Sequence, residues 1–319
     1  MEVFYLTAEQ MAVLFGFMLA GFILRKSGAV SDGAHTALSR TATFVFMPAL
    51  VLSALAENCD AQSFAENAPL ILYGAGLLAF ALAIGYIFSR LLFIKEKDGG
   101  GYERNIYKYA FAIANFGYMG NVIVLGVWGG EMLYKYTMFT LPLQIAVYSW
   151  GLFVLIPRGE GKGVKGMLKG LLNPPMIAMA AGFVLGLSGA GKHLPGFVSS
   201  MLSGAGGCVG PVCMLVAGMI IGGYKAKEIL TGYRIYVVTA ARLIAIPALI
   251  VLALKLFGAP SDVVSLALVA FATPIGLNVI VFPSAYGADT KPGAGMVLLS
   301  NVLAVATIPL MYLVFAVLT

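Results

Sequence analysis

Charged residues are scarce in this sequence. Only 11% of the 319 residues are Asp, Glu, Lys or Arg, whereas an ordinary globular chain has about 25%. Apolar residues make up 60% of the chain, and the mean hydropathy is +0.93. This composition excludes a soluble globular protein and is typical of an all-α membrane protein whose surroundings are mostly lipid.

Cysteine and histidine are also rare. The three cysteines, Cys59, Cys208 and Cys213, form no CxxC pair, so neither a disulfide framework nor a zinc site is indicated. The two histidines form no HExxH motif, and there is no Walker lysine motif. We therefore predict no enzyme, no catalytic residue, no metal site and no cofactor. Energy for any transport has to come from an ion gradient, a substrate gradient or a partner.

Ten apolar runs are long enough to cross a bilayer, which takes about 20 residues for a helix. No Asp or Glu lies in the middle of a run, which removes the usual carboxylates for intramembrane proteolysis and for proton relays. Ten spans use roughly 200 residues, so the connections are too short to hold a soluble domain. The runs lie at 8–24, 36–55, 69–93, 105–129, 137–157, 174–191, 196–223, 232–257, 263–287 and 295–318.

Lysine and arginine are distributed unevenly between alternate connections. Of the 20 such residues, Lys135, Lys192 and Lys255 lie on one set of connections and Arg242 lies inside a span, which leaves 16 on the other set. Cytoplasmic loops carry an excess of Lys and Arg, so the set with 16 is expected to be cytoplasmic. With ten spans, both termini are then expected outside. The net charge of +6 reflects this orientation, and no nucleic acid partner is predicted.

The longest connection, 158–173, is Gly-rich and basic. It could be a short helix on an anionic leaflet or a solvated linker that enforces orientation. It divides the chain into two units of five spans, 1–157 and 174–319. An odd number of spans in each unit means that the second unit is inverted relative to the first, as in many secondary transporters.

Three internal matches support a repeat across this linker. Asn121–Val124 recurs as Asn278–Val281, and Pro142-Leu143 recurs as Pro309-Leu310. Pro48 in the second span has a counterpart at Pro211 in the seventh. The matches occur in the same order in corresponding spans, so the sequence predicts two inverted five-helix repeats.

Glycine, proline and asparagine interrupt the apolar pattern in the fourth and ninth spans. Such residues unwind a helix, and unwound backbone inside a bilayer is tolerated where it lines a cavity or is buried in protein. The amides and freed helix N-termini would then bind an anion. Alternatively, Gly and Pro are simply common in spans, and Asn joins neighbouring helices. The candidate binding residues are Asn115, Gly117, Tyr118, Gly120 and Asn121 in the fourth span and Pro274, Gly276 and Asn278 in the ninth.

Two further candidates lie in other spans. Arg242 is the only charge clearly inside a span. It is either a counter-charge for the anion or a gate residue, or it pairs with backbone carbonyls near the cytoplasmic mouth. Gln144 in the fifth span either lines the polar site or joins two helices.

Several motifs resemble those of the auxin efflux carrier family, in its bacterial branch. They are Asn115-x-Gly117-Tyr118-Met119-Gly120, Asn173-Pro174-Pro175, Pro274-x-Gly276-x-Asn278 leading to Tyr286-Gly287, and Ser300 followed by Thr307-x-Pro309-Leu310. The resemblance covers the whole chain. One departure is Val122, where members of the family commonly have proline.

The resemblance implies a fold shared with bile-acid sodium symporters. Spans one, two, six and seven would form a scaffold, and the other six spans would form a transport domain whose broken helices cross. It further implies an elevator-type secondary carrier of a small organic carboxylate in the bacterial inner membrane, often a homodimer, with a proton or sodium as the coupling ion. The alternatives are a sodium-coupled symporter of the bile-acid type and a membrane sensor or scaffold that does not transport.

Overall fold

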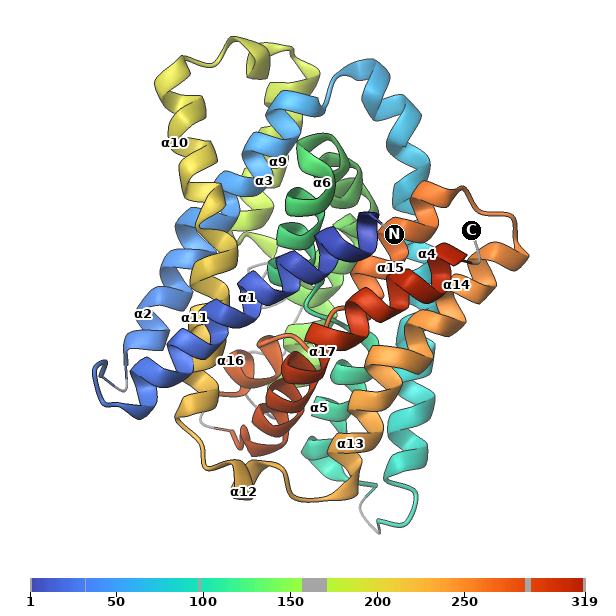
Figure 1. Ribbon diagram of the computed structural model, residues 1–319. Coiled ribbons are helices and arrows are strands. Elements are labelled where there is room, and N and C mark those ends of the chain that lie inside the picture. Colours follow the sequence, from blue (N-terminus) through green and yellow to red (C-terminus); the bar gives the residue numbers. More distant parts are fainter. Residues whose placement is uncertain (1, 32, 97–98, 157–170, 285–287, 318–319) are drawn as a thin grey trace.

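The computed structural model describes residues 2–31, 33–96, 99–156, 171–284 and 288–317. These residues are almost entirely helical and contain no β-strand, only a single isolated backbone bridge. Most of the basic linker expected at 158–173 lies outside the described residues. The helices form one bundle in which the two halves of the chain are interleaved (Figure 1).

Seven of the described helices are long and apolar enough to cross a membrane. They make the chain a multi-pass, all-α membrane protein. Two shorter apolar helices, Pro174–Leu187 and Ser261–Ala272, accompany them. The seven helices are Val3–Lys26, Ala34–Asn58, Ala61–Leu92, Phe116–Leu155, Gly196–Gly222, Tyr233–Leu256 and Lys291–Phe315.

The helices of the first half begin at the N-terminus and end before the linker. Gly129, with φ 79°, bends α6 at the point where the sequence places a boundary between two spans. In chain order they are α1 (Glu2–Lys26), α2 (Ala34–Thr41), η1 (Ala42–Phe46), α3 (Met47–Asn58), α4 (Ala61–Leu92), α5 (Gly101–Ala112), η2 (Phe116–Gly120), α6 (Asn121–Ala146), η3 (Val147–Gly151) and α7 (Leu152–Leu155).

The second half begins where the side chain of Asn173 caps α9 by accepting a hydrogen bond from the Met176 N–H. Its helices are α9 (Pro174–Leu187), η4 (Ala190–His193), α10 (Gly196–Gly207), α11 (Val209–Gly222), α12 (Ala226–Ile229), α13 (Tyr233–Ala240), η5 (Ala241–Ala245), α14 (Ile246–Leu256), α15 (Ser261–Ala272), α16 (Asn278–Ser284) and α17 (Lys291–Val317).

Glycine allows α1 and α11 to pack with their backbones in contact. A Cβ atom at Gly21 would collide with the Leu215 carbonyl oxygen, and one at Gly218 would collide with the Met18 carbonyl oxygen. Small residues at such crossings let helices approach closely in a membrane. The same kind of approach joins α9 to α3, where Gly186 lies against the carbonyl oxygen of Cys59.

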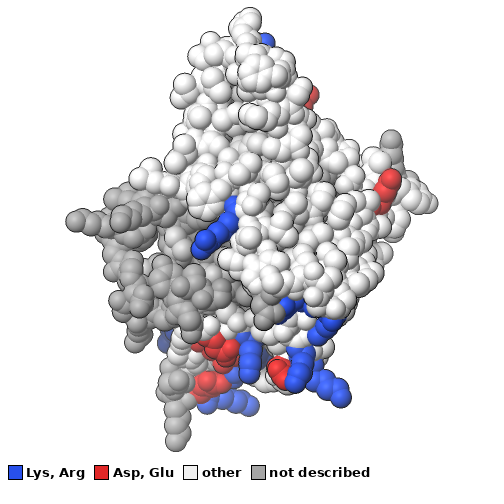
Figure 2. All heavy atoms as spheres, turned by 90° about the vertical axis from the view of Figure 1, so that its left-hand side faces the viewer, with Lys and Arg blue, Asp and Glu red and all other residues white. Residues whose placement is uncertain are grey.

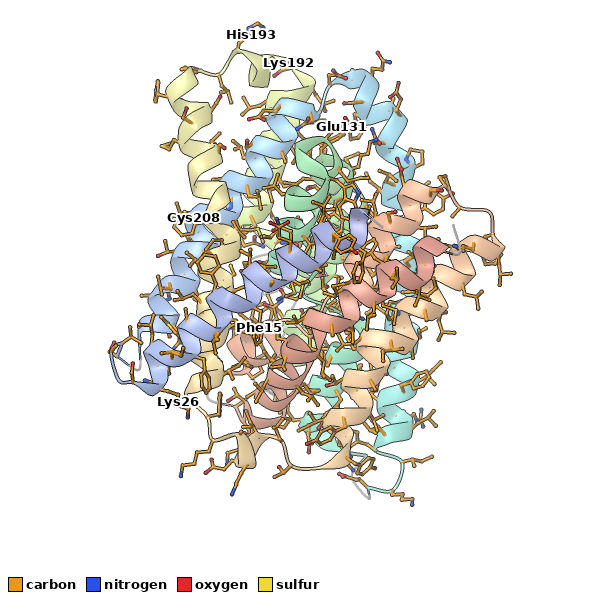
Figure 3. All side chains as sticks on the ribbon, viewed as in Figure 1. Phe15, Lys26, Glu131, Lys192, His193 and Cys208 are labelled. Atoms are coloured by element: carbon orange, nitrogen blue, oxygen red, sulfur yellow. The ribbon has the colours of Figure 1, made fainter. Side chains whose placement is uncertain are left out.

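Charged side chains lie mainly at one end of the bundle. Figure 2 shows Lys and Arg gathered, together with some Asp and Glu, at the lower end of one face, below a broad surface that is mostly uncharged. Lys26 and Lys192 mark opposite ends in Figure 3. At the lower end Lys26 donates to the Tyr224 carbonyl, and at the upper end Lys192 forms an ion pair of 3.2 Å with Asp60. We call the lower end the basic end.

Candidate functional site

The two broken helices cross at the centre of the bundle. α5 ends at Ala112 and α15 ends at Ala272, and after each helix the backbone continues without helix for several residues. The Asn115 N–H donates to the Pro274 carbonyl oxygen at 2.8 Å, within an antiparallel bridge between Ala114 and Ile275. The crossing therefore ties the two halves of the chain together through their backbones.

Side chains satisfy the backbone groups that the breaks leave without a helical partner. The Ile275 N–H donates to the Oγ of Ser300 on α17 at 3.1 Å, and Ser300 is fully buried. The Tyr136 hydroxyl donates to the Phe116 carbonyl oxygen at 3.1 Å. Gly120 makes room for this hydroxyl, because a Cβ atom at position 120 would collide with it. Unwound backbone can persist inside a membrane protein when its polar groups are paired in this way.

A cavity of about 190 Å³ lies beside the crossing. It is bounded on one side by α2, η1 and α11 and on the other by η2, η3 and α16. Its polar groups include the Asn278 amide, the Tyr118 and Tyr148 hydroxyls and the guanidinium of Arg40. We call it the crossing cavity. Its lining consists of Ser39, Arg40, Ala42, Thr43, Phe44, Tyr118, Tyr148, Cys213, Val216, Leu277, Asn278, Val281 and Phe282.

Five lining residues lie on π-helical segments: Ala42, Thr43 and Phe44 on η1, Tyr118 on η2 and Tyr148 on η3. π-helical turns inside α-helices occur frequently at functional sites. The hydroxyls of Thr43 and Tyr118 lie 2.9 Å apart and form a hydrogen bond across the cavity wall. Asn278 is held by a 3.0 Å hydrogen bond from its Nδ2 to the Tyr109 hydroxyl.

A second cavity of about 510 Å³ adjoins the first, because both are lined by Ser39, Arg40 and Val281. Its wall also includes Arg25 and His35, which lie at or near the basic end of the bundle. Together the two cavities form a route from the basic end to the crossing. Arg40 stands at the junction and brings a positive charge to the inner cavity.

Two of the ten residues that the sequence nominates, Tyr118 and Asn278, line the crossing cavity. Asn115, Pro274 and Gly276 form the crossing itself, through backbone contacts.

The remaining nominated residues pack around the crossing. The Nδ2 of Asn121 faces the Met47 sulfur at 3.8 Å, as expected of a residue that joins two helices. Gly117 faces Gln144, since a Cβ atom at position 117 would lie 3.7 Å from its Oε1, and Gly120 contacts Tyr136.

Arg242 lies away from the crossing cavity. It is fully buried on η5, its Nη1 donates to the Phe111 carbonyl oxygen at 3.1 Å, and its guanidinium lies 5.7 Å from the centre of the Phe271 ring. Phe111 and Phe271 belong to the last turns of α5 and α15. Arg242 therefore lies against the last turns of both half-helices, where a positive charge is favourable, and its Nε and Nη2 are buried without a hydrogen-bond partner among the described residues.

Sequence reasoning missed four polar lining residues, Ser39, Arg40, Thr43 and Tyr148. The first three lie on the second apolar run or beside it, and nothing in their spacing distinguishes them from ordinary span residues. One signal was present: Arg40 lies inside a predicted span, four residues from its start. Charges within spans often mark substrate pathways.

Comparisons with known proteins agree with this geometry. A family model described as "Membrane transport protein" matches residues 6–312. An uncharacterized transporter of Methanothermobacter thermautotrophicus is 24% identical over 222 residues, which cover 69% of each chain. An uncharacterized transporter of Methanocaldococcus jannaschii is 22% identical over 207 residues, which cover 63% of this chain and 65% of the relative. Because the family model spans nearly the whole chain, the protein belongs to this membrane transport family, the auxin efflux carrier family.

Proposed function

We propose that the protein is a secondary carrier that binds a small organic carboxylate in the crossing cavity and moves it across the bacterial inner membrane. The observation that carries the proposal is the cavity beside two crossed, broken helices, with a route to the basic end. Transporter sites near the bilayer centre are commonly built from such discontinuous helices.

The chemistry of the cavity favours a carboxylate. Arg40 supplies a positive charge, and Asn278 supplies an amide. The hydroxyls of Ser39 and Tyr148 add further donors, whereas those of Thr43 and Tyr118 are bonded to the Ser39 carbonyl oxygen and to each other. No Asp or Glu lines either cavity among the described residues, so an anion meets no opposing charge. The remaining walls are apolar and would accept the carbon skeleton of an organic acid.

The size of the cavity favours a small substrate. A water molecule takes about 30 Å³ of liquid volume, so a cavity of about 190 Å³ holds roughly the volume of six waters. That space suits a short mono- or dicarboxylate better than a bulky amphipathic anion. This is the main reason to prefer a small acid over a substrate of the bile-acid type.

The proposed architecture is ten spans in two inverted repeats. In such a repeat, span one corresponds to span six, and span two corresponds to span seven. The close pair α1 and α11 then corresponds to the close pair α9 and α3. In the same way, the pair α4 and α5 corresponds to α14 and α15. These matched neighbours support the inverted repeat, as does the bridge between the two broken segments.

The proposed mechanism is elevator-type alternating access. A scaffold of spans one, two, six and seven would hold still, while spans three to five and eight to ten carry the crossing. The crossing cavity lies between these two groups, since α2, η1 and α11 belong to the scaffold and η2, η3 and α16 to the moving unit. Two similar halves in opposite orientation can exchange conformations and generate states of comparable energy.

The proposed orientation places the basic end in the cytoplasm and both termini outside, following the excess of Lys and Arg in cytoplasmic loops. The route from the basic end to the crossing then makes this conformation inward-facing.

Flux in proteoliposomes tests the proposed function. Asn278→Ala removes an amide from the cavity wall, and Asn67→Ala is a matched control, because the side chain of Asn67 bonds only within its own helix, to the Ser63 carbonyl. A lost hydrogen bond to a charged ligand is worth about 1.5–3 kcal/mol, roughly tenfold to a hundredfold in affinity. We expect carboxylate uptake by the wild type and by Asn67→Ala and strongly reduced uptake by Asn278→Ala. Equal uptake by all three proteins would refute the assignment of the site.

A further inference from the structure

A second polar pocket lies at the basic end, on the outer side of α4 and α5 and away from the crossing cavity. Its volume is about 210 Å³, and it is lined by Tyr86, Ser89, Arg90, Arg104 and Lys108. The lower parts of α4 and α5 lie side by side (Figure 1). Three cations therefore face one small space, and the carrier mechanism uses none of them.

No carboxylate neutralises these cations within the described part of the chain. None of the ion pairs found there includes Arg90, Arg104 or Lys108. Lys108 donates to the Asn105 side-chain oxygen at 3.0 Å, which leaves its charge uncompensated. The Nε of Arg104 is buried and has no hydrogen-bond partner. Like charges in one pocket repel each other, so this arrangement favours a bound anion with several acceptor oxygens.

The acidic residue nearest in sequence is directed elsewhere. Glu103 precedes Arg104 in α5, and its carboxylate interacts with Arg234 from the start of α13. Glu96 also pairs with Arg234. The described acidic residues Glu96 and Glu103 thus engage Arg234, which does not line the pocket.

The surroundings of the pocket are apolar and exposed. Ile87, Phe88, Leu91 and Ile94 near the end of α4 have exposed fractions of 45–70%, and Tyr86 lies at the pocket edge and is also exposed. Exposed apolar side chains on a membrane helix face lipid tails. Because this pocket lies at the basic end of the bundle, beside an exposed apolar surface, it is placed where lipid headgroups lie.

We propose that Arg90, Arg104 and Lys108, in a pocket also lined by Tyr86 and Ser89, form a binding site for a phosphate group. Guanidinium groups match the geometry of phosphate oxygens, and a lysine adds a point charge. The flanking apolar surface favours a phosphate carried by an anionic phospholipid over free phosphate. The site is separate from the crossing cavity, because the two share no lining residue.

Titration of the purified full-length protein tests the site. In neutral detergent, phosphatidylglycerol is added in one arm and inorganic phosphate in the other, and binding is followed by the shift in the thermal unfolding midpoint. The pocket variant combines Arg90→Gln with Lys108→Gln. If this double variant folds poorly, Arg90→Gln alone is used. The control is Lys225→Gln with Lys227→Gln, which removes the same charge at the same end of the bundle but outside the pocket.

We expect phosphatidylglycerol to bind the wild type and the control equally and the pocket variant at least about tenfold more weakly, because each charge-assisted hydrogen bond contributes about that factor or more. Binding of phosphatidylglycerol alone assigns the site to a lipid headgroup. Binding of inorganic phosphate with the same dependence on the variants assigns it to free phosphate. No binding in either arm, or equal binding by wild type and pocket variant, would overturn the proposal. An equal loss in the control would also overturn it, since diffuse charge would then explain the effect.

Discussion

The hydrogen bond between Thr43 and Tyr118 offers a quantitative test of domain movement. It joins η1 of the proposed scaffold to η2 of the proposed moving unit, with the two hydroxyl oxygens 2.9 Å apart. Movement of the crossing relative to the scaffold has to break it. A neutral hydrogen bond contributes about 0.5–1.5 kcal/mol net, so its loss should shift the equilibrium away from this conformation by about twofold to thirteenfold.

The perturbations are Tyr118→Phe, Thr43→Val and both together. Tyr118→Phe removes only the hydroxyl. Thr43→Val also removes a hydrogen bond to the Ser39 carbonyl oxygen, so Thr41→Val serves as the control, because Thr41 forms the same kind of bond to the Ala37 carbonyl oxygen and contacts no other side-chain hydroxyl.

The assay measures how fast a cysteine at position 281 reacts with a thiol reagent from the basic end. Val281 lines both cavities, and the natural cysteines are replaced beforehand. The labelling rate follows the fraction of protein in the accessible conformation, so each single variant should react more slowly by at most the factor given above. Thr41→Val should react as the parent does, and the double variant should add little to Tyr118→Phe. Unchanged rates in all variants, or fully additive effects of the two single changes, would refute the moving-unit reasoning.

Three further predictions follow from buried or capped polar groups. Ser300→Ala leaves the Ile275 N–H without a partner and should lower the free energy of unfolding by about 1–3 kcal/mol. Unfolding by dodecyl sulfate measures this change, and unchanged stability would contradict the described crossing. Arg242→Met should destabilise by a similar amount, about 1–3 kcal/mol, yet leave the carboxylate Kd of the folded protein unchanged, whereas a weakened Kd would return Arg242 to the substrate site. The pKa of Asp60 is lowered from its ordinary value of 3.8, first by a backbone N–H and then by Lys192. The stability that Asp60 contributes is therefore complete above that ordinary value and is lost as pH falls through the lower folded pKa, so Asp60→Asn should flatten the acid limb of a thermal stability profile; an unchanged limb would contradict this.

The break in the ninth span could be predicted because its cause is local. Proline lacks the N–H that a helix needs, and Pro274 lies in the break between α15 and α16. In the fourth span the break lies at 113–115, before the glycines, and Gly120 itself is helical, with φ −61° and ψ −47°. The same local logic explains the Asn173 cap at the start of α9.

The cavity lining could not be predicted because it depends on tertiary contacts. Thr43 and Tyr118 are 75 residues apart, and no spacing rule in either helix brings them together. The role of Arg242 was likewise undecided in the sequence, because the distance to the Phe111 carbonyl is fixed only by how η5 packs on the end of α5. The π-helical turns that carry Thr43, Tyr118 and Tyr148 leave no mark in apolar periodicity.

The number of long helices differs from the predicted number of spans for an identifiable reason. Seven described helices meet the length and hydropathy expected of a membrane span. One of them, Phe116–Leu155, contains the bend at Gly129, where the sequence places the end of the fourth span. The broken ninth span and the short α9 are each less than a full membrane thickness of continuous helix. The merged, broken and short helices thus account for the difference between the seven long helices and the ten proposed spans.

Calorimetric titration of small mono- and dicarboxylates into the purified protein tests the central claim, that an anion binds in the crossing cavity beside Arg40. Arg40→Gln removes the cavity's charge, and Lys227→Gln is the control, since it removes a positive charge at the same end but lines none of the three cavities. The account predicts that at least one carboxylate binds the wild type and Lys227→Gln equally and Arg40→Gln at least about tenfold more weakly. Binding of no carboxylate, or equal binding by Arg40→Gln and the wild type, would contradict it.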